Sequence, residues 1–395
     1  MHMANNTAVG KETYRHVESA AAQRSKYGAA VCGDFIMEDK TPEAATIAVF
    51  DGIGSGIKAN IAAHLNASRL FSMLKNGFTL REAGEKIAAS MHAARSENIP
   101  FAAFSVARVL NDGHATVLTY EMPAPVFVQQ GSALAAQQRY FIMGSELVGE
   151  SHFKLDDGCA IMLFSDGVTQ AGMGMKGKFA AGWGIKEAAA FADSLVKEGV
   201  GPEKIAGLMV EEAKNLSGGE FCDDTTAVIL TTRPGRTVNI LTGPPADRGK
   251  DFEMVRGFME SPGIKIVCGS TTADIVSQQT GIILKTGRGS GSYLNPPRYY
   301  MQGIDIATEG AFSLNQLYNI LDYDNKMYDR DSCVSEMAVL IKAVDRIIIW
   351  AGNSVNENYQ PIIFKQLGLF PRKKIIPFIE EKLRKMGKLV VRKDF

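Results

Sequence analysis

Three acidic motifs border three apolar segments of the chain, and their residue types suit metal and phosphate chemistry. The motifs are Asp51-Gly52 after residues 46–50, Asp166-Gly167 after residues 160–164, and Asp223-Asp224 before residues 225–230. An unbroken apolar run is typical of a strand buried on both faces. Carboxylates at the ends of neighbouring strands repel one another unless cations neutralise them, and hard oxygen ligands suit Mg²⁺ or Mn²⁺. The pattern therefore predicts a carboxylate-bound metal site of the kind that often hydrolyses phosphate esters.

Each motif also has an ordinary structural interpretation. Asp-Gly is among the commonest turn dipeptides, and two adjacent aspartates before a strand can simply cap its end. The combination favours the metal site, because the same arrangement occurs three times within about one domain length.

The composition bounds the kind of protein. A chain of 395 residues predicts two domains, and 43 Lys and Arg against 43 Asp and Glu predict no nucleic-acid or membrane partner. No apolar run approaches the roughly 20 residues of a membrane-spanning helix, and Met1 to Arg15 lacks the apolar core of a signal peptide. Five scattered cysteines without a CxxC pair indicate neither a zinc site nor a disulfide framework. We therefore expect a cytoplasmic protein.

The order of expected elements divides the chain near residue 235. Residues 1–235 show segregated runs of strands and helices, which is typical of an α+β domain. In this part, apolar residues at helical spacing (Ile57, Ile61 and Leu65) predict a helix to residue 75, and Thr79 with Glu82 forms a capping box before a second helix.

Residues 236–395 instead alternate strands and helices, which predicts a smaller α/β domain. Strands are expected at 238–242, 264–268 and 346–351, and helices at 251–260 and 272–279. A basic C-terminal stretch predicts a solvated helix over 377–386 and a closing strand at 389–392, an interpretation that we favour over docking of an acidic partner or nucleic acid.

The sequence does not match two other motifs that bind or hydrolyse phosphate. Residues 172–178 have the spacing of a Walker A loop, but Phe179 stands where a Ser or Thr would hold Mg²⁺. No cysteine has an arginine six residues later, which argues against a cysteine-nucleophile phosphatase.

Four motifs in chain order resemble the metal-dependent Ser/Thr protein phosphatases, the PPM or type 2C family. The motifs are Cys32-Gly33-Asp34-Phe35, Phe50-Asp51-Gly52-Ile53-Gly54-Ser55-Gly56, Phe164-Ser165-Asp166-Gly167-Val168 and Asp223-Asp224-Thr225-Thr226. The glycine-rich second motif and Pro123-Ala124-Pro125 are most similar to the bacterial SpoIIE-type branch. The resemblance covers about residues 25–232 and says nothing about the later residues.

The resemblance implies a fold of two stacked antiparallel sheets flanked by helix pairs, and it implies a role for each acidic residue. Asp51 matches a carboxylate that bridges two metal ions, and the Gly52 carbonyl matches a ligand of one of them. Asp166 and Asp223 match ligands of the other ion, with Asp224 as the alternative if the register slips by one residue. Asp34 matches an acidic residue that orients water.

The resemblance also implies a reaction. Two Mn²⁺ or Mg²⁺ ions would share a hydroxide that attacks the phosphorus of phosphoserine or phosphothreonine on a regulatory protein, such as an anti-anti-sigma-like partner. The phosphate-binding arginine of eukaryotic members has no clear counterpart, although Arg24 and Lys26 lie in that region.

Two alternatives stay open at this point. The first domain could bind phosphoproteins without hydrolysing them, or the second domain could be a small-molecule sensor that governs the phosphatase. For the second domain, Cys268 to Thr272 follows an expected strand and precedes a helix, which favours a small anionic ligand. An ordinary helix N-cap explains Thr271 and Thr272 equally well.

Overall fold

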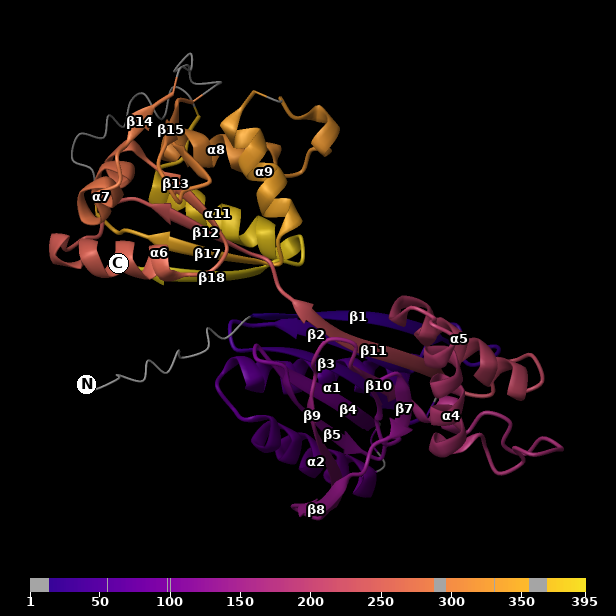
Figure 1. Cartoon of the computed structure of the whole chain (residues 1–395). Coiled ribbons are helices and arrows are strands. Elements are labelled where there is room, and N and C mark those ends of the chain that lie inside the picture. Colours follow the sequence, from indigo (N-terminus) through magenta and orange to yellow (C-terminus); the bar gives the residue numbers. More distant parts are fainter. Residues whose placement is uncertain are drawn as a thin grey trace, which may run out of the picture. The chain divides into compact units, whose positions relative to one another are not determined.

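The chain consists of two compact units, Met1–Pro234 and Gly235–Phe395 (Figure 1). The computed structural model describes residues 14–54, 56–97, 99, 101–287, 296–329, 331–354 and 368–395. Ser55 of the motif at residues 50–56 therefore lies outside the described residues.

The first unit contains two antiparallel sheets. One has the order β1 (Arg15–Arg24), β11 (Thr225–Pro234), β10 (Ala160–Phe164), β6 (Val126–Gln129) and β7 (Ser132–Ala135). The other has the order β2 (Asp34–Lys40), β3 (Ala44–Gly52), β4 (Ala102–Leu110), β5 (His114–Tyr120), β9 (Glu146–Lys154) and β8 (Arg139–Met143). All strand pairs within these two sheets are antiparallel.

The two sheets stack, and a helix pair covers the outer face of each. Helices α1 (Gly56–Lys75) and α2 (Leu80–Ser96) share a buried apolar cluster with the six-stranded sheet. Helices α4 (Gly184–Lys197) and α5 (Pro202–Leu216) do so with the five-stranded sheet. A third cluster, which includes Val49 and Leu163, joins the inner faces of the two sheets. This confirms the expected fold of stacked antiparallel sheets flanked by helix pairs.

Helix α1 buries a different face from the one that its large apolar residues mark. Ile57, Ile61 and Leu65 are 65%, 58% and 56% exposed. The buried face instead consists mainly of alanines, with larger side chains near its C-terminal end. It comprises Ala59, Ala62, Ala63, Asn66, Ala67, Leu70 and Phe71. Small residues let the helix approach the sheet closely. The spacing of the large apolar residues therefore predicted the helix correctly but pointed to the wrong buried side.

The start of α2 follows the capping box that the sequence predicts. The Thr79 hydroxyl accepts a hydrogen bond from the Glu82 backbone N–H, and the Glu82 carboxylate accepts one from the Thr79 N–H at 2.8 Å. Two backbone donors that the helix leaves unpaired are thereby satisfied.

The second unit is a doubly wound α/β domain. Its sheet has the order β14 (Lys285–Thr286), β15 (Arg298–Tyr300), β16 (Ile306–Thr308), β13 (Ile264–Cys268), β12 (Thr237–Thr242), β17 (Arg346–Ala351) and β18 (Leu389–Asp394). From β16 to β18 all neighbours are parallel. Along the chain these five strands come third, second, first, fourth and fifth, so the order reverses between β12 and β17.

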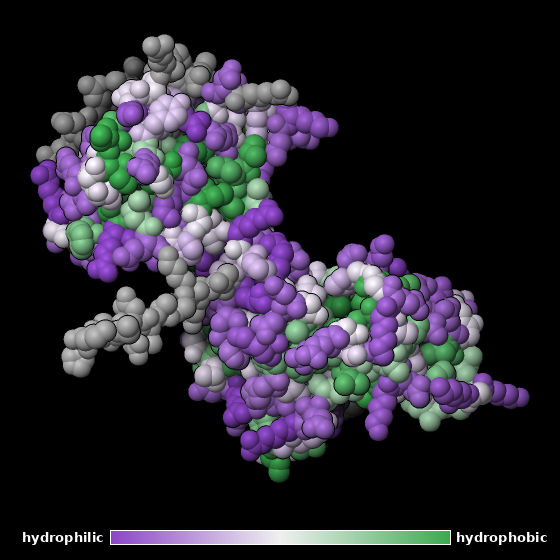
Figure 2. Space-filling model, viewed as in Figure 1, coloured by the Kyte–Doolittle hydropathy of each residue, from purple (hydrophilic) through white to green (hydrophobic). Residues whose placement is uncertain are grey.

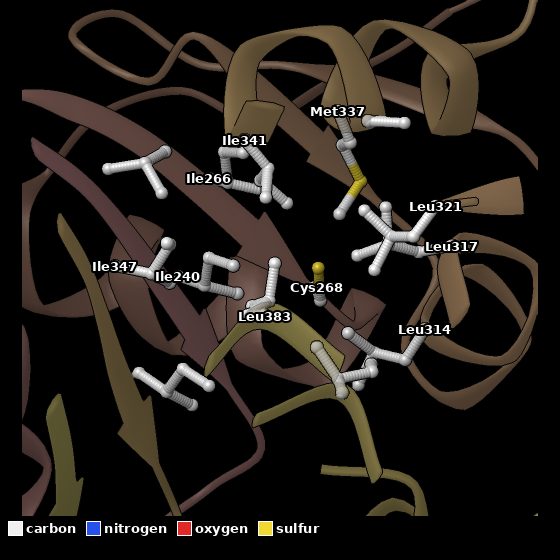
Figure 3. Close-up of a cluster of buried hydrophobic side chains, with 14 of the residues drawn as sticks. Ile240, Ile266, Cys268, Leu314, Leu317, Leu321, Met337, Ile341, Ile347 and Leu383 are labelled. Carbon is white, nitrogen blue, oxygen red and sulfur yellow. The ribbon is translucent and has the colours of Figure 1, made fainter. Parts of the chain in front are cut away.

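Helices cover both faces of this sheet. The helices are α6 (Asp251–Glu260), α7 (Ser270–Thr280), α8 (Ala311–Ile320), α9 (Cys333–Ala343) and α11 (Arg372–Lys385), with 3₁₀ turns at Arg248–Lys250 and Asn325–Met327. Figure 3 shows Ile240, Ile266 and Ile347 of the strands converging with apolar side chains of α8, α9 and α11. A separate cluster packs α6 and α7 on the opposite face.

Helix α11 begins five residues before the expected start at Pro377. Pro377 lies inside the helix, where it cannot donate the usual backbone hydrogen bond. The buried residues Ile375, Ile376, Ile379 and Leu383 form a stripe that spans the proline. Burial of that stripe against the sheet outweighs the lost hydrogen bond, which explains the longer helix.

The surface of both units is mainly polar in the visible face, with apolar residues in small groups (Figure 2). Among the described residues, no helix is both long enough and apolar enough to cross a membrane.

Candidate metal centre

Two of the predicted acidic residues meet across a strand pair. Asp34 opens β2 and pairs directly with Asp51 near the end of β3. Side chains of paired residues in an antiparallel sheet lie on the same face. Strand alternation places Asp51 on the same face as Val49, which packs between the two sheets. Both carboxyl groups therefore lie at one edge of the interface between the sheets.

The five-stranded sheet contributes a hydroxyl to this edge. The Thr226 hydroxyl of β11 donates a hydrogen bond of 2.6 Å to Asp34 Oδ2, although the two residues are 192 positions apart. Asp34 is only 2% exposed, and its other oxygen, Oδ1, is buried without a hydrogen-bond partner in the described part of the chain. A buried acceptor without a partner is costly, so this oxygen is suited to receive a ligand or an ordered water.

The Asp166 carboxyl reaches the same edge from the five-stranded sheet. Asp166 is the first residue of the short helix α3 (Asp166–Thr169), directly after β10 and Ser165. It is close enough to Asp51 to share a hydrogen bond, which helps to raise the Asp51 pKa. Gln170 Nε2 donates a hydrogen bond of 2.6 Å to Asp166 Oδ2 and so orients that carboxyl group.

Burial and mutual repulsion make ionisation unfavourable in this group. The pKa of Asp51 is raised well above its ordinary value, first by burial and then by the charges of Asp34, Asp166 and Asp223. Burial likewise raises the pKa of Asp34, while the hydrogen bond from Thr226 opposes that change. Positive charge at this edge would relieve both costs.

The adjacent residues Asp223 and Asp224 have different surroundings. Asp224 is 5% exposed, and its two oxygens accept hydrogen bonds from the backbone N–H groups of Lys26 (2.9 Å) and Gly33 (2.8 Å). Asp223 has a pKa that is raised by burial and by Asp166, and lowered by Lys26. Asp223 therefore faces the other carboxylates, whereas Asp224 fastens the segment that carries Asp34.

Two of the motif glycines are required by close backbone approach. A Cβ atom on Gly52 would lie 2.0 Å from the carbonyl oxygen of Ala59 in α1. A Cβ atom on Gly167 would lie 2.1 Å from the carbonyl oxygen of Asp224. Glycine at both positions lets the second, third and fourth motifs pack together with α1.

The sequence alone did not assign a site role to four residues at this edge, although three of them, Ser165, Thr226 and Lys26, lie in or beside the matched motifs. Thr226 and Gln170 hold the carboxyl groups of Asp34 and Asp166, and Ser165 accepts a hydrogen bond from the Thr226 backbone N–H at 2.9 Å. Lys26 is the cation that lowers the Asp223 pKa. Ser165 and Thr226 belong to the matched motifs, and this was the sequence signal from which a role at the site could have been predicted.

The carboxylates converge without forming a closed ligand shell. Across the part of the chain that the structure describes, no three His, Cys, Asp or Glu side chains gather closely enough to hold a metal ion. Burial and the charge of Asp34 raise the pKa of the nearby Cys32 thiol to about 12, so it is no thiolate at neutral pH.

Residues 41–233 match the family model described as Stage II sporulation protein E (SpoIIE). The first unit is a SpoIIE-family domain. The matched range contains Asp51, Asp166, Asp223 and Asp224, and it begins after Asp34. A comparison with curated proteins finds no significant match.

Solved structures give weaker likenesses to this chain. The PP2C phosphatase domain of SpoIIE from Bacillus subtilis, with a fragment of its regulatory domain, is 17% identical with a TM-score of 0.47. That match covers 56% of this chain, and the chain spans 63% of the length of that structure. The RsbU and RsbW domains of Rv1364c from Mycobacterium tuberculosis are also 17% identical, with a TM-score of 0.46. That match covers 63% of this chain and 69% of that structure.

Proposed function

We propose that the first unit is a divalent-metal-dependent phosphatase of phosphoserine and phosphothreonine on a regulatory protein. The observation that carries the proposal is that Asp34, which pairs directly with Asp51 in one sheet, accepts a 2.6 Å hydrogen bond from Thr226 of the other sheet, with Asp166 near enough to raise the Asp51 pKa. Buried carboxyl groups that repel one another are the expected environment for cations.

The donor set fits Mn²⁺ or Mg²⁺, because it consists of carboxylate and carbonyl oxygens. Asp51, the Gly52 carbonyl, Asp166 and Asp223 would hold such ions. We leave Asp224 out of this ligand set, because it is buried and its two oxygens each accept a backbone hydrogen bond that fastens the segment around Gly33. When bound, such ions supply Lewis acidity toward a water molecule and toward phosphoryl oxygens.

The chain's own residues would position the reactants. Thr226 holds one oxygen of Asp34 and leaves Oδ1 free to accept a hydrogen bond from the attacking water. Lys26 lies close enough to influence Asp223 and can supply positive charge to the substrate phosphoryl group. Lys26 would thereby bind the substrate phosphate, the task that an arginine performs in the eukaryotic members.

The substrate class follows from the family and not from the site geometry. We propose a phosphorylated regulatory protein, of the anti-anti-sigma type, as the substrate, and signal transduction in the cytoplasm as the setting. The net charge of zero offers no argument for a nucleic-acid partner.

The test is hydrolysis of p-nitrophenyl phosphate by the full chain with Mn²⁺, compared with Asp166→Asn. Asp166→Asn should lower turnover by about 100-fold or more at low Mn²⁺. The matched control is Asp156→Asn, which removes the same charge from a side chain that is 66% exposed. Turnover in Asp166→Asn equal to that of the control would refute the site. Mn²⁺ binding without hydrolysis of this ester or of a phosphoserine peptide would favour the binding-only alternative.

A further inference from the structure

In the second unit, four loops meet at the C-terminal edge of the parallel strands. The loops follow β12, β13, β16 and β17, and they contain the glycines Gly243, Gly269, Gly310 and Gly352. The strand order reverses between β12 and β17 at this edge. In open α/β sheets, such a reversal leaves a crevice in which ligands bind.

Hydrogen bonds and close approaches hold these loops together. The Gly352 N–H donates to the Thr242 carbonyl at 3.0 Å, which joins the ends of β17 and β12. The Gly243 N–H donates to the Thr272 hydroxyl in the first turn of α7 at 2.9 Å. A Cβ atom on Gly269 would lie 3.8 Å from the Cα of Gly310. The glycines at this edge thus let the neighbouring loops pack closely against one another.

A half-buried arginine lies against this edge. Arg372, the first residue of α11, donates from Nη2 to the carbonyls of Gly352 (2.9 Å) and Ser354 (2.8 Å). A Cβ atom on Gly243 would lie 2.0 Å from Cζ and Nη1, so the guanidinium group rests directly on this glycine. Burial lowers the pKa of Arg372, and no carboxylate pairs with it among the described residues.

Thr242 supplies a second, independent observation. It is 1% exposed, and its hydroxyl is buried without a hydrogen-bond partner in the described part of the chain. Strand alternation puts Thr242 on the same face as Ile240, the face that α11 covers. Among the described residues, a buried hydroxyl without a partner and a half-buried guanidinium group without a carboxylate partner therefore occur one residue apart along the edge, at Thr242 and against Gly243.

We propose that this edge of the sheet binds the phosphate group of a phosphorylated small molecule. The Arg372 fork supplies the charge and the Thr242 hydroxyl donates a hydrogen bond, while the first turns of α8 and α11 at the same edge add backbone N–H groups. A macromolecular phosphate is disfavoured, because Thr242 lies below the surface.

The experiment uses the full chain with Trp183→Phe, so that Trp350 in the second unit is the one tryptophan left. Thermal unfolding is followed by Trp350 fluorescence in EDTA, which removes divalent-metal-dependent binding by the first unit. Inorganic phosphate, AMP and glucose 6-phosphate are added separately at about 10 mM and constant ionic strength, and a bound ligand raises the midpoint by mass action. The variants are Arg372→Gln and Thr242→Val, with Lys374→Gln as an exposed control on the same helix.

We expect at least one probe to raise the midpoint in the parent and in Lys374→Gln. Arg372→Gln and Thr242→Val should each weaken the apparent affinity by roughly tenfold or more. Thr242→Val keeps the shape of the site and should fold at least as stably as the parent, since it removes a hydroxyl without a partner. A larger shift with AMP assigns a nucleotide, and a larger shift with glucose 6-phosphate assigns a sugar phosphate. No shift with any probe, or equal shifts in all variants, would overturn the proposal.

Discussion

At the scale of single residues, the centre depends on neighbours with opposite tasks. Asp223 and Asp224 are adjacent, yet one faces other carboxylates and the other accepts two backbone hydrogen bonds. The second role is structural, because it fastens Gly33 and thereby the start of β2 at Asp34. Replacing Asp223 and replacing Asp224 should therefore affect metal binding and stability differently.

Asp223→Asn and Asp224→Asn should have opposite effects on the stability of the first unit in EDTA. Asp224→Asn places an amide donor against a backbone N–H and should cost about 1–3 kcal/mol. Asp223→Asn removes a repelled charge and should leave the stability equal or higher, while abolishing the stabilisation by added Mn²⁺. Unfolding is followed by Trp183 fluorescence in the Trp350→Phe background. The reverse pattern would make Asp224 the metal ligand.

At this scale the sequence predicts part of the site. Asp51 and Asp166 follow apolar runs that can only be buried strands, so their position at a sheet edge is predictable. Thr226 could not be placed against Asp34 beforehand, because their contact depends on the stacking of two sheets and joins residues 192 positions apart. The choice between Asp223 and Asp224 depends on the same register.

At the scale of elements, one ion pair links helix α2 to the six-stranded sheet. Arg81 of α2 donates from Nε and Nη2 to the two oxygens of Glu150 on β9, at 2.8 and 2.5 Å. The Glu150 side chain is 2% exposed, and His152 lies 3.2 Å from it. The bidentate contact with Arg81 lowers the pKa of Glu150 below its ordinary value of 4.5.

Glu150→Gln should destabilise the first unit at neutral pH by about 1–3 kcal/mol. The lowered pKa means that the ionised form stabilises the fold above the unfolded-state value of 4.5, and that this contribution is lost as the pH falls. The difference from wild type should therefore shrink as the pH is lowered below 4.5. Urea unfolding at several pH values measures it, with the exposed Glu211→Gln as the control. A difference that is constant with pH would contradict the ionic explanation.

Elements with strong local patterns are predicted well, and those defined by context are not. The apolar runs 264–268 and 346–351 are strands with those bounds. The two- and three-residue strands β14, β15 and β16 are too short to carry a pattern of their own. Helix α11 was predicted too short, because the local signal of Pro377 was outweighed by tertiary burial.

Pro377→Ala should stabilise the second unit by about 1–3 kcal/mol. The exposed proline side chain makes no core contact that alanine would remove, and alanine restores a backbone donor inside α11. Trp350 fluorescence in the Trp183→Phe background reports the urea midpoint, and Lys373→Ala serves as an exposed control on the same helix. Equal or lower stability in Pro377→Ala would show that the proline fits this helix without strain.

At the scale of the whole molecule, each unit has its own core. Among the described residues, the three apolar clusters of the first unit lie between positions 17 and 230, and the two clusters of the second lie beyond position 237. Each unit also contains one of the two tryptophans, Trp183 or Trp350. Segregated runs before residue 235 and strand–helix alternation after it indicated the two architectures, but the reversal of strand order appears only in the folded sheet.

Leu317→Ala should therefore lower the stability of the second unit by about 2–5 kcal/mol, since it opens a cavity among fully buried neighbours. In the Trp183→Phe background the Trp350 transition should shift, whereas in the Trp350→Phe background the Trp183 transition should not. Leu70→Ala, from the buried face of α1, is the reciprocal variant and should affect the Trp183 transition alone. Equal shifts of both transitions in either variant would mean that the two cores unfold as one, against the division at residue 235.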